Sequence, residues 1–368
     1  MADNKDKKVL NVPALRFPEF TGEWKFVHLK DVAEFQKKRI SSDLLNNNNY
    51  ISTENILQNF EGIQYSSSIP TNTNVIEYQK GDILLSNIRP YLKKVWFSDR
   101  KGGCSADVFV LRGDKCDQHF LYYVIASDRF INYVMSGVKG VKMPRGDKSQ
   151  MEKYAFSIPT NTEQRKIAKF LSMLDERIKL QNKIIEKLET LIKGIIETVI
   201  SSQKPNTLIK NCLECNSSTL QESQVAETGT FPVYGATGIS GYTEAADING
   251  ESILIIKDGS GVGTVKFVTG EYSYIGTLNS LSAKDGYCLK YIYIALQRFN
   301  FEPYKTGMAI PHIYFKDYGK AKIFCPTIKE QFAIAKRISS IEDKVSVEKR
   351  ILFYYQAQKS YLLSQMLI

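Results

Sequence analysis

The chain has 368 residues, of which 43% are hydrophobic and 11% aromatic, so it can bury a sizeable core and wholesale disorder is excluded. At ~150 residues per domain, this length indicates about two to three domains. The 49 Lys and Arg residues exceed the 39 Asp and Glu residues, and the formal net charge of +10 weakly favours a polyanionic partner.

Targeting and redox features of the sequence indicate the cytoplasm. No apolar run reaches the ~18 residues of a membrane span, and the charged first eight residues are not followed by the apolar stretch of a secretory signal. The six cysteines are sparse and scattered, which fits reduced thiols better than a disulfide framework. Only three histidines occur, so a zinc site built on several histidines is not favoured. We therefore expect a cytoplasmic protein with no membrane partner, no metal and no cofactor.

A long-range repeat organises the chain. Residues 159–164 (PTNTEQ) recur as residues 326–331 (PTIKEQ), 167 positions later, and the same offset relates Pro144 to Pro311. With a slip of two residues, Arg129-Phe130 matches Arg298-Phe299. Matches in the same order indicate that one unit, a domain followed by a tail, has been duplicated.

Each globular part combines predicted strands with predicted helices. Residues 81–97 and 251–268 are rich in β-branched and aromatic residues, which is typical of strands and hairpins. Residues 119–133 and 289–298 have the spacing of amphipathic helices. The predicted order is a first domain (1–157), a central spacer helix (158–202), a second domain (203–324) and a C-terminal spacer helix (325–368).

The sequence of each tail predicts a long helix. Its apolar residues form a seam whose spacing alternates between four and three residues, which is the ~3.5-residue period of a coiled coil. Gln181 and Glu348 fall at the same step of the two seams. Two such helices would expose much apolar surface if they were separate, so we expect them to pack together, antiparallel if a two-fold relates the halves. The predicted fold class is α+β, with two mixed domains joined by an antiparallel coiled coil and a pseudo-two-fold internal repeat. The seam positions are Ile167, Leu171, Leu174, Ile178, Gln181, Ile185, Leu188, Ile192, Ile195 and Val199, and then Ile334, Ile338, Ile341, Val345, Glu348, Leu352, Tyr355, Lys359, Leu362 and Met366.

The search for catalytic motifs is mostly negative. No Walker A lysine, no His-Glu-x-x-His and no Asn-Pro-Pro-aromatic tetrapeptide of amino-methyltransferases occurs. Residues 258–264 (DGSGVGT) superficially resemble a phosphate loop but lack its lysine, so we favour a glycine-rich hairpin or a loop that approaches bases. Cys212 and Cys215 form a lone CxxC, for which buried or incidental thiols are favoured over a zinc or redox site.

Basic clusters mixed with polar and aromatic residues are the positive finding. Residues 89–96 and 139–150 form two clusters, and residues 304–316 form the loop that matches the second of them while sharing little beyond its proline. Arginine and lysine pair with phosphates, and arginine can bind guanine through two hydrogen bonds. The two copies share one structural frame but differ in the residues that would make contacts. This difference favours two domains that read two different DNA sequences. The candidate DNA-binding residues are Asn87, Arg89, Lys93, Lys94, Lys139, Lys142, Arg145 and Lys148 in the first domain, and Lys257, Ser260, Thr264, Lys266, Lys305, Thr306, His312 and Lys316 in the second.

With these motifs in place, the chain resembles the specificity (S) subunit of type I restriction–modification systems over essentially its whole length. The resemblance rests on residues 12–24 (VPALRFPEFTGEW), 81–86 (GDILLS) and 231–239 (FPVYGATGI), and on the signature of residues 159–175 with its copy from Pro326. It implies two target-recognition domains, each reading one half of a bipartite site in double-stranded DNA. It also implies spacer helices that set the spacing and dock two methyltransferase subunits, with restriction subunits joining, and no catalysis by this subunit itself.

Two alternatives remain open on the residues alone. A coiled-coil scaffold or adaptor would bind proteins through the two domains, but it has no need for divergent basic loops. An independent enzyme using Cys212 and Cys215 is the least favoured.

Overall fold

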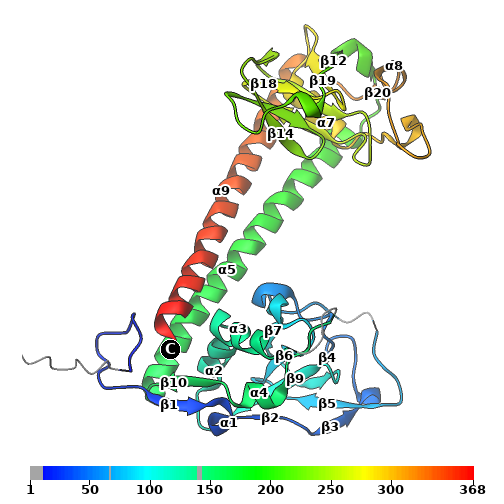
Figure 1. Ribbon diagram of the computed structural model, residues 1–368. Coiled ribbons are helices and arrows are strands. Elements are labelled where there is room, and N and C mark those ends of the chain that lie inside the picture. Colours follow the sequence, from blue (N-terminus) through cyan, green and yellow to red (C-terminus); the bar gives the residue numbers. More distant parts are fainter. Residues whose placement is uncertain (1–10, 66–67, 139–142) are drawn as a thin grey trace, which may run out of the picture. The chain divides into compact units, whose positions relative to one another are not determined.

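The computed structural model describes residues 11–65, 68–138 and 143–368, and the chain divides into two units. The first unit comprises Met1–Gln181 with Ile351–Ile368, and the second comprises Asn182–Arg350. Each unit holds one mixed domain and a part of both long helices, α5 (Asn161–Ile196) and α9 (Ile328–Met366) (Figure 1). The fold class predicted from the sequence is confirmed.

The first domain is built on two four-stranded sheets. One sheet has the order β2 (Ala33–Phe35), β9 (Val108–Gly113), β6 (Ile83–Ser86) and β7 (Val95–Phe97), and all its neighbours are antiparallel. The other has the order β3 (Arg39–Ser41), β5 (Asn74–Tyr78), β8 (Gly102–Cys104) and β4 (Tyr50–Ile51), with β4 parallel to β8. A ribbon of β1 (Lys25–His28) with β10 (Ala155–Ile158) completes its strands among the described residues. The helices are α1 (Leu29–Val32), α2 (Gln118–Ile125), α3 (Asp128–Ser136) and α4 (Lys148–Glu152), with single turns η1 (Ser42–Leu44), η2 (Gln58–Phe60) and η3 (Pro90–Leu92).

The second domain repeats this topology. Its sheet β12 (Leu213–Ser217), β19 (Leu278–Ala283), β16 (Ser252–Ile256) and β17 (Val265–Val268) has the strand order of its counterpart. Its other sheet has the order β14 (Gly238–Thr243), β13 (Phe231–Gly235), β18 (Glu271–Tyr274) and β15 (Ile248–Asn249). Strands β13, β18 and β15 correspond to β4, β8 and β5 of the first domain. The fourth strand, β14, pairs with β13, whereas β3 of the first domain pairs with β5, so the two fourth strands lie at opposite edges of the sheet. The remaining elements are the ribbon β11 (Thr207–Leu208) with β20 (Lys322–Ile323), helices α6 (Ile209–Cys212), α7 (Leu289–Leu296) and α8 (Phe315–Tyr318), and the single 3-10 turns η5 (Glu222–Gln224) and η6 (Glu302–Tyr304). The π-helical segment η4 (Glu197–Ser201) directly continues α5.

Two matching helix predictions had different outcomes. The helix expected over residues 289–298 is α7, but the one expected over residues 119–133 is two helices, α2 and α3. The break comes at Ser127, whose hydroxyl accepts the N–H of Phe130 and donates to the carbonyl of Val124. A serine that caps the next helix competes with helix continuation, and periodicity alone does not register it.

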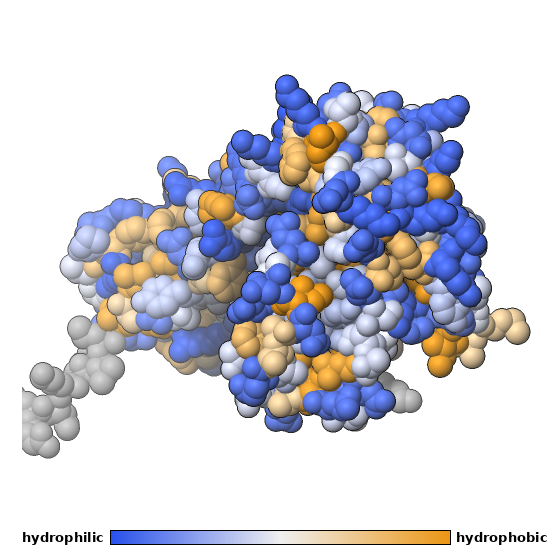
Figure 2. Space-filling view, turned by 90° about the horizontal axis from the view of Figure 1, so that it is seen from above, coloured by the Kyte–Doolittle hydropathy of each residue, from blue (hydrophilic) through white to orange (hydrophobic). Residues whose placement is uncertain are grey.

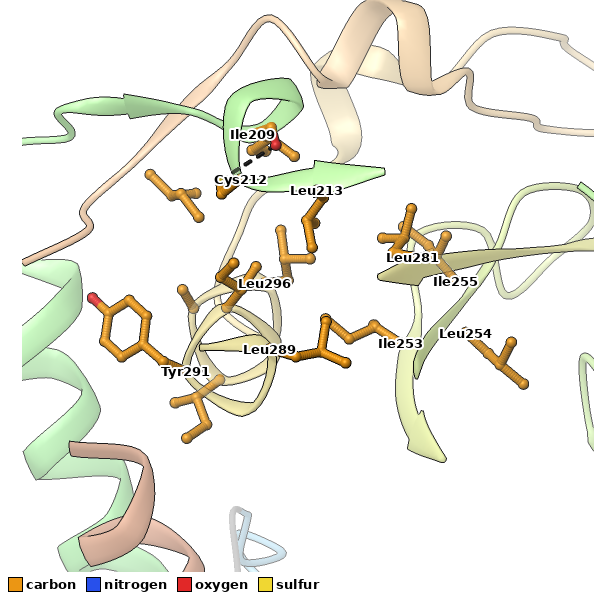
Figure 3. Close-up of a cluster of buried hydrophobic side chains, with 14 of the residues drawn as sticks. Ile209, Cys212, Leu213, Ile253, Leu254, Ile255, Leu281, Leu289, Tyr291 and Leu296 are labelled. Atoms are coloured by element: carbon orange, nitrogen blue, oxygen red, sulfur yellow. Dashed lines mark hydrogen bonds between the residues drawn. The ribbon is translucent and has the colours of Figure 1, made fainter. Parts of the chain in front are cut away.

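The core of the second domain lies between α7 and the β16 sheet. All five residues of β16 are buried, and Figure 3 shows Ile253, Ile255, Leu281 and Leu296 within one apolar cluster. Because side chains on both faces of β16 are buried, the strand reads as a continuous apolar run, which explains the sequence ILII. Ile196 of α5 and Ile338 of α9 belong to the same cluster, so the long helices are part of this core.

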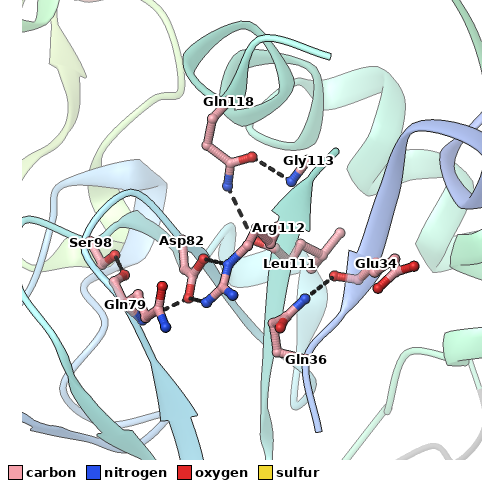
Figure 4. Close-up of polar contacts among 9 residues, drawn as sticks. All are labelled: Glu34, Gln36, Gln79, Asp82, Ser98, Leu111, Arg112, Gly113 and Gln118. Atoms are coloured by element: carbon pink, nitrogen blue, oxygen red, sulfur yellow. Dashed lines mark hydrogen bonds and ion pairs between the residues drawn. The ribbon is translucent and has the colours of Figure 1, made fainter. Parts of the chain in front are cut away.

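In the first domain, an ion pair between the buried Asp82 and the partly exposed Arg112 ties neighbouring strands together at one end of the β6 sheet (Figure 4). The carboxylate of Asp82, which is 1% exposed, contacts Nε and Nη2 of Arg112 at 2.7 Å each and accepts the N–H of Gln79 at 2.7 Å. The turn before Asp82 uses Gly81 with φ +91°, a left-handed conformation that favours glycine. A bidentate pair with its oxygens satisfied can offset the cost of burying the charge.

The coiled-coil seam predicted from the sequence is confirmed, because every predicted seam position of α5 and α9 is buried or partly buried. In the first unit, Asp175 of α5 pairs with Lys359 of α9 at 2.5 Å, and in the second, Glu189 pairs with Lys349 at 2.7 Å. An early residue of α5 thus faces a late residue of α9 in the first unit, and in the second unit a late residue of α5 faces the middle of α9, as expected of antiparallel helices. Lys359 occupies a seam position with its side chain 13% exposed, and the ion pair accounts for a charge there.

Candidate nucleic-acid interface

The segment that follows β6 pairs with the segment that precedes α4. The N–H of Arg89 donates to the carbonyl of Pro144 at 2.8 Å, and the N–H of Gly146 donates to the carbonyl of Asn87 at 3.0 Å. These bonds form an isolated antiparallel bridge between Ile88 and Arg145. We call residues 87–89 with 144–146 the first bridge site.

The second domain builds the same backbone arrangement from the segment that follows β16. The N–H of Gly259 donates to the carbonyl of Pro311 at 2.9 Å, and the N–H of Ile313 donates to the carbonyl of Lys257 at 2.9 Å. Asp258 and His312 form the antiparallel bridge. Residues 257–259 with 311–313 are the second bridge site, and Pro311 and His312 match Pro144 and Arg145 at the 167-residue offset.

A third hydrogen bond is common to the two bridge sites. The N–H of Asn87 donates to the carbonyl of Asp107 at 2.8 Å, and that of Lys257 donates to the carbonyl of Thr277 at 3.0 Å. A buried side-chain oxygen without a hydrogen-bond partner among the described residues accompanies each site: Asn87 Oδ1 within the first, and Oγ1 of Thr277, whose carbonyl accepts from Lys257, beside the second. The backbones therefore agree bond for bond, whereas the side chains differ at almost every position.

The predicted residues of the first domain fall into two groups. Arg89 is exposed, has φ +50°, and its guanidinium makes no hydrogen bond or ion pair with a described residue. Arg145 is 52% exposed and pairs with Asp107 at 2.9 Å. These two residues and Asn87 lie together at the bridge site.

The predicted lysines of the first domain have partners inside the protein. Lys93 pairs with Asp128 at 2.6 Å, and Lys94 donates to the carbonyl of Thr53 at 2.7 Å, where burial lowers the pKa of Lys94. Lys148 lies over the ring of Phe35 at 5.0 Å and 3.8 Å from Glu152. Lys139 and Lys142 lie outside the described residues.

In the second domain, the glycine-rich segment is the turn of the β16–β17 hairpin. Gly259 and Gly263 have φ +99° and +90°, and a Cβ on Gly263 would lie 2.9 Å from Cβ of Phe301. This turn exposes Ser260 and Thr264 to solvent.

Two of the other predicted residues of the second domain, Lys257 and His312, belong to its bridge site, and Thr306 pairs with His312. Lys257 belongs to the site and partly offsets the burial that raises the pKa of Cys215 to about 11. Thr306 and His312 exchange both backbone hydrogen bonds, at 2.9 and 2.8 Å. The other three lysines have local partners: Lys266 over the ring of Tyr234 at 4.5 Å, Lys316 over that of Tyr314 at 5.0 Å, and Lys305 with Glu302 at 2.5 Å.

Two exposed residues at the bridge sites were not singled out from the sequence. Met143 precedes Pro144, and Ile310 precedes Pro311, so the 167-residue offset relates them as well. That repeated apolar–proline pair was the signal in the sequence that could have identified the two residues.

No group of three or more His, Cys, Asp or Glu within the described ranges is arranged to hold a metal ion. In the same part of the chain, no helix is long and apolar enough to cross a membrane.

Comparison with known proteins gives a consistent result. The family model described as the type I restriction modification DNA specificity domain matches residues 21–190 and 211–352. The chain is 27% identical over 124 residues to the type I restriction enzyme EcoDI specificity subunit of Escherichia coli, covering 33% of this chain and 28% of that protein. It is 27% identical over 204 residues to the MjaVIII specificity subunit of Methanocaldococcus jannaschii, covering 54% of this chain and 46% of that protein. The chain therefore spans less than half the length of these curated relatives.

Solved structures agree in fold. The S subunit of a type I restriction–modification system from M. genitalium superposes with a TM-score of 0.68 at 17% identity, covering 97% of this chain and 99% of that chain. A structure from a study of complex assembly and conformational transition of the type I R-M system superposes with a TM-score of 0.55 at 18% identity, covering 93% and 96%. At these identities the likeness concerns the fold.

Proposed function

Because the chain belongs to the type I restriction–modification DNA specificity family, we propose that its two domains read the two halves of a bipartite target in double-stranded DNA. The recognition domains would be residues 1–157 and 203–324, and the spacer helices residues 158–202 and 325–368. The observation that carries the proposal is the pair of bridge sites, which have one backbone arrangement and different side chains.

The side chains of the bridge sites suit the reading of different base sequences. The first site offers the guanidinium of Arg89, which has no partner among the described residues, and arginine binds O6 and N7 of guanine in the major groove. The second has Gly259 at the position of Arg89 and Asp258 at that of Ile88. A carboxylate can accept from N4 of cytosine, so the two sites would differ in the bases they select.

The lysines near each site would serve a different purpose from the bridge-site residues. Lys93, Lys148, Lys266, Lys305 and Lys316 lie on the surface beside carboxylates or rings. Contacts from such residues to phosphates set the register of a protein on a duplex without reading sequence. When a surface lysine exchanges a protein carboxylate for a DNA phosphate, little free energy is lost, because exposed ion pairs contribute little to stability.

We further propose that α5 and α9 set the distance between the half-sites and dock two methyltransferase subunits, which restriction subunits then join. Both helices keep large apolar side chains exposed away from their shared seam, which marks surface for protein partners. These side chains are Met173 (52% exposed), Leu180 (58%) and Leu191 (49%) on α5, and Phe353 (65%), Tyr354 (67%) and Tyr361 (61%) on α9. Catalysis would belong to the partner subunits. The alternative of a coiled-coil adaptor without DNA recognition is not favoured by the family match.

A domain exchange tests the proposal. The chain is co-expressed with its methyltransferase subunits, and the methylated motif is found by single-molecule sequencing of the host DNA. Exchange of residues 203–324 for the second domain of another family member should change one half of the motif and leave the other. Exchange of residues 1–157 is the reciprocal control. A change in both halves from either exchange would contradict independent reading, and binding without sequence preference in the wild type would contradict the function.

A further inference from the structure

In both units, the residue before the repeated proline is a large apolar side chain exposed to solvent. Met143 is 49% exposed and Ile310 is 66% exposed. Each is followed by a proline whose carbonyl accepts a bridge-site hydrogen bond, and then by a basic residue, Arg145 or His312. The bridge-site backbone therefore fixes where these apolar side chains lie, and the chain builds that placement twice.

In the second unit, the loop that carries Ile310 is a narrow hairpin held at its base. Thr306 and His312 close it through two backbone hydrogen bonds. Gly307 has φ +89°, and a Cβ there would lie 2.4 Å from the carbonyl oxygen of Ile310, so only glycine fits. Met308 stands fully exposed at the tip, with a relative accessibility of 107%. The hairpin thus presents apolar side chains from a constrained backbone.

Seen from one side, the surface of the molecule is mainly hydrophilic, and its apolar side chains form small separate patches (Figure 2). The sequence neighbours of Met143 and Ile310 identify the chemistry of a partner. Ile310 is next but one to His312, and Lys305 and Lys316 flank the same loop; Met143 is next but one to Arg145. A DNA duplex offers phosphates to the cations Arg145, Lys305 and Lys316 and apolar base surfaces to the apolar side chains near them.

We propose that Met143 and Ile310 are specificity-determining residues, each contacting an apolar base surface in its own half-site. The inference rests on the proposed function and deepens it. Two base surfaces share this chemistry, the C5-methyl group of thymine in the major groove and the face of a base at an opened step. In either case the side chain contributes through shape and apolarity, with no charge involved.

The test uses the complex of this chain with its methyltransferase subunits. Met143→Ser and Ile310→Ser remove the apolar surface, whereas Met143→Leu and Ile310→Val keep it. Leu44→Ser and Ile239→Ser are matched controls, since these residues are 73% and 53% exposed and lie outside the bridge sites. Thermal unfolding followed by circular dichroism confirms that each variant is folded.

Each serine variant should bind the target duplex about tenfold more weakly, the usual effect of one lost base contact, and should relax the methylated motif at a position in one half only. Binding to random duplex should not change, because no charge is removed. The leucine and valine variants and both controls should match the wild type. If both serine variants keep the wild-type motif and affinity, the base-contact proposal is overturned while the proposed function stands. A wild-type complex that prefers no sequence would instead overturn the function.

Two modified duplexes distinguish the thymine methyl group from an opened base step as the surface that the side chain contacts. If deoxyuridine in place of a thymine weakens the wild type about tenfold but leaves the serine variant unchanged, the contact is the methyl group. If 2-aminopurine fluorescence rises with the wild type but not with the serine variant, the contact is an opened base step. Loss of affinity in the serine variants with neither response would overturn a base contact.

Discussion

Gln164 and Gln331 make the same two hydrogen bonds in the two halves of the chain. The Oε1 atom of each accepts the backbone N–H of the residue that precedes a domain helix, Asp117 before α2 at 2.8 Å and Cys288 before α7 at 3.0 Å. Each Nε2 atom donates at 2.9 Å to the carbonyl of the proline five residues earlier. Both side chains are 2% exposed, so each joins a domain to its long helix from a buried position.

Replacing either glutamine should destabilise its own unit. Gln164→Ala or Gln331→Ala leaves one buried and one partly buried backbone group unpaired, so the free energy of unfolding should fall by about 1–3 kcal/mol in each case. Urea unfolding followed by circular dichroism measures the loss. Gln358→Ala, an exposed change on α9, is the control. A loss no larger than that of the control would show that these bonds are replaced by water.

The ion pair in the helix seam gives a second prediction. Asp175 contacts Lys359 at 2.5 Å and accepts the hydroxyl of Tyr123 at 2.8 Å. Lys359→Met should lower the free energy of unfolding by about 1–3 kcal/mol, because a partly buried carboxylate loses its counter-charge. The double variant with Asp175→Asn should recover part of that loss, and a double-mutant cycle measures the coupling. Lys344→Met on the exposed face of α9 should have little effect, and strictly additive changes would disprove the coupling.

A third prediction concerns thiol reactivity. Burial raises the pKa of Cys215 to about 11, and the charge of Lys257 opposes this rise. Only the thiolate is alkylated, so iodoacetamide labelling of Cys215 should keep accelerating with pH beyond ~8.5, where an ordinary thiol is half ionised. Peptide mass spectrometry measures the rate in folded and urea-unfolded protein. Lys257→Met should displace the profile to still higher pH, and a folded-state plateau near the ordinary value would refute the shift.

A fourth prediction concerns salt. The net charge of +10 and the surface lysines imply that DNA affinity depends on counterion release, with a slope near 0.9 per phosphate contact. The purified chain alone should bind duplex weakly, and its affinity should fall steeply between ~50 and ~200 mM salt. Fluorescence anisotropy with a random duplex measures this, and a flat dependence would argue against phosphate contacts.

The last prediction treats the helices as a spacer. Glu189 and Lys349 face each other at 2.7 Å, so four residues inserted after Leu188 and four after Glu348 lengthen both helices at the same level. The insertion adds ~6 Å and a rotation of ~40° beyond one full turn, with a stutter in the seam. The methylated motif should keep both half-sequences and gain about one to two unspecified base pairs, because DNA turns once per ~10 base pairs. An unchanged spacer in an active complex would show that the helices do not set the distance.

Features with a local or periodic basis were predictable from the sequence. The seam of α5 and α9 follows from spacing alone, and the ordered matches at a constant offset indicated the duplication. The bridge sites could not be predicted, because Ile88 and Arg145 meet only after the sheets have formed. The environments of Lys93 and Lys94 depend in the same way on Asp128 and Thr53, which are distant in sequence. A basic cluster therefore indicates a surface without showing which of its charges already have partners.

The composition of the first core has a consequence for the order of synthesis. That core contains Leu362, Met366 and Leu367, which pack with Ile167 and Leu171. A ribosome that has reached Arg350 has supplied all of the second unit, Asn182–Arg350, while the first still lacks Ile351–Ile368. The domain translated first is thus the one whose core is completed last. Until then, the nascent chain carries an uncovered apolar stripe on the first part of α5, a segment that chaperones would recognise during translation.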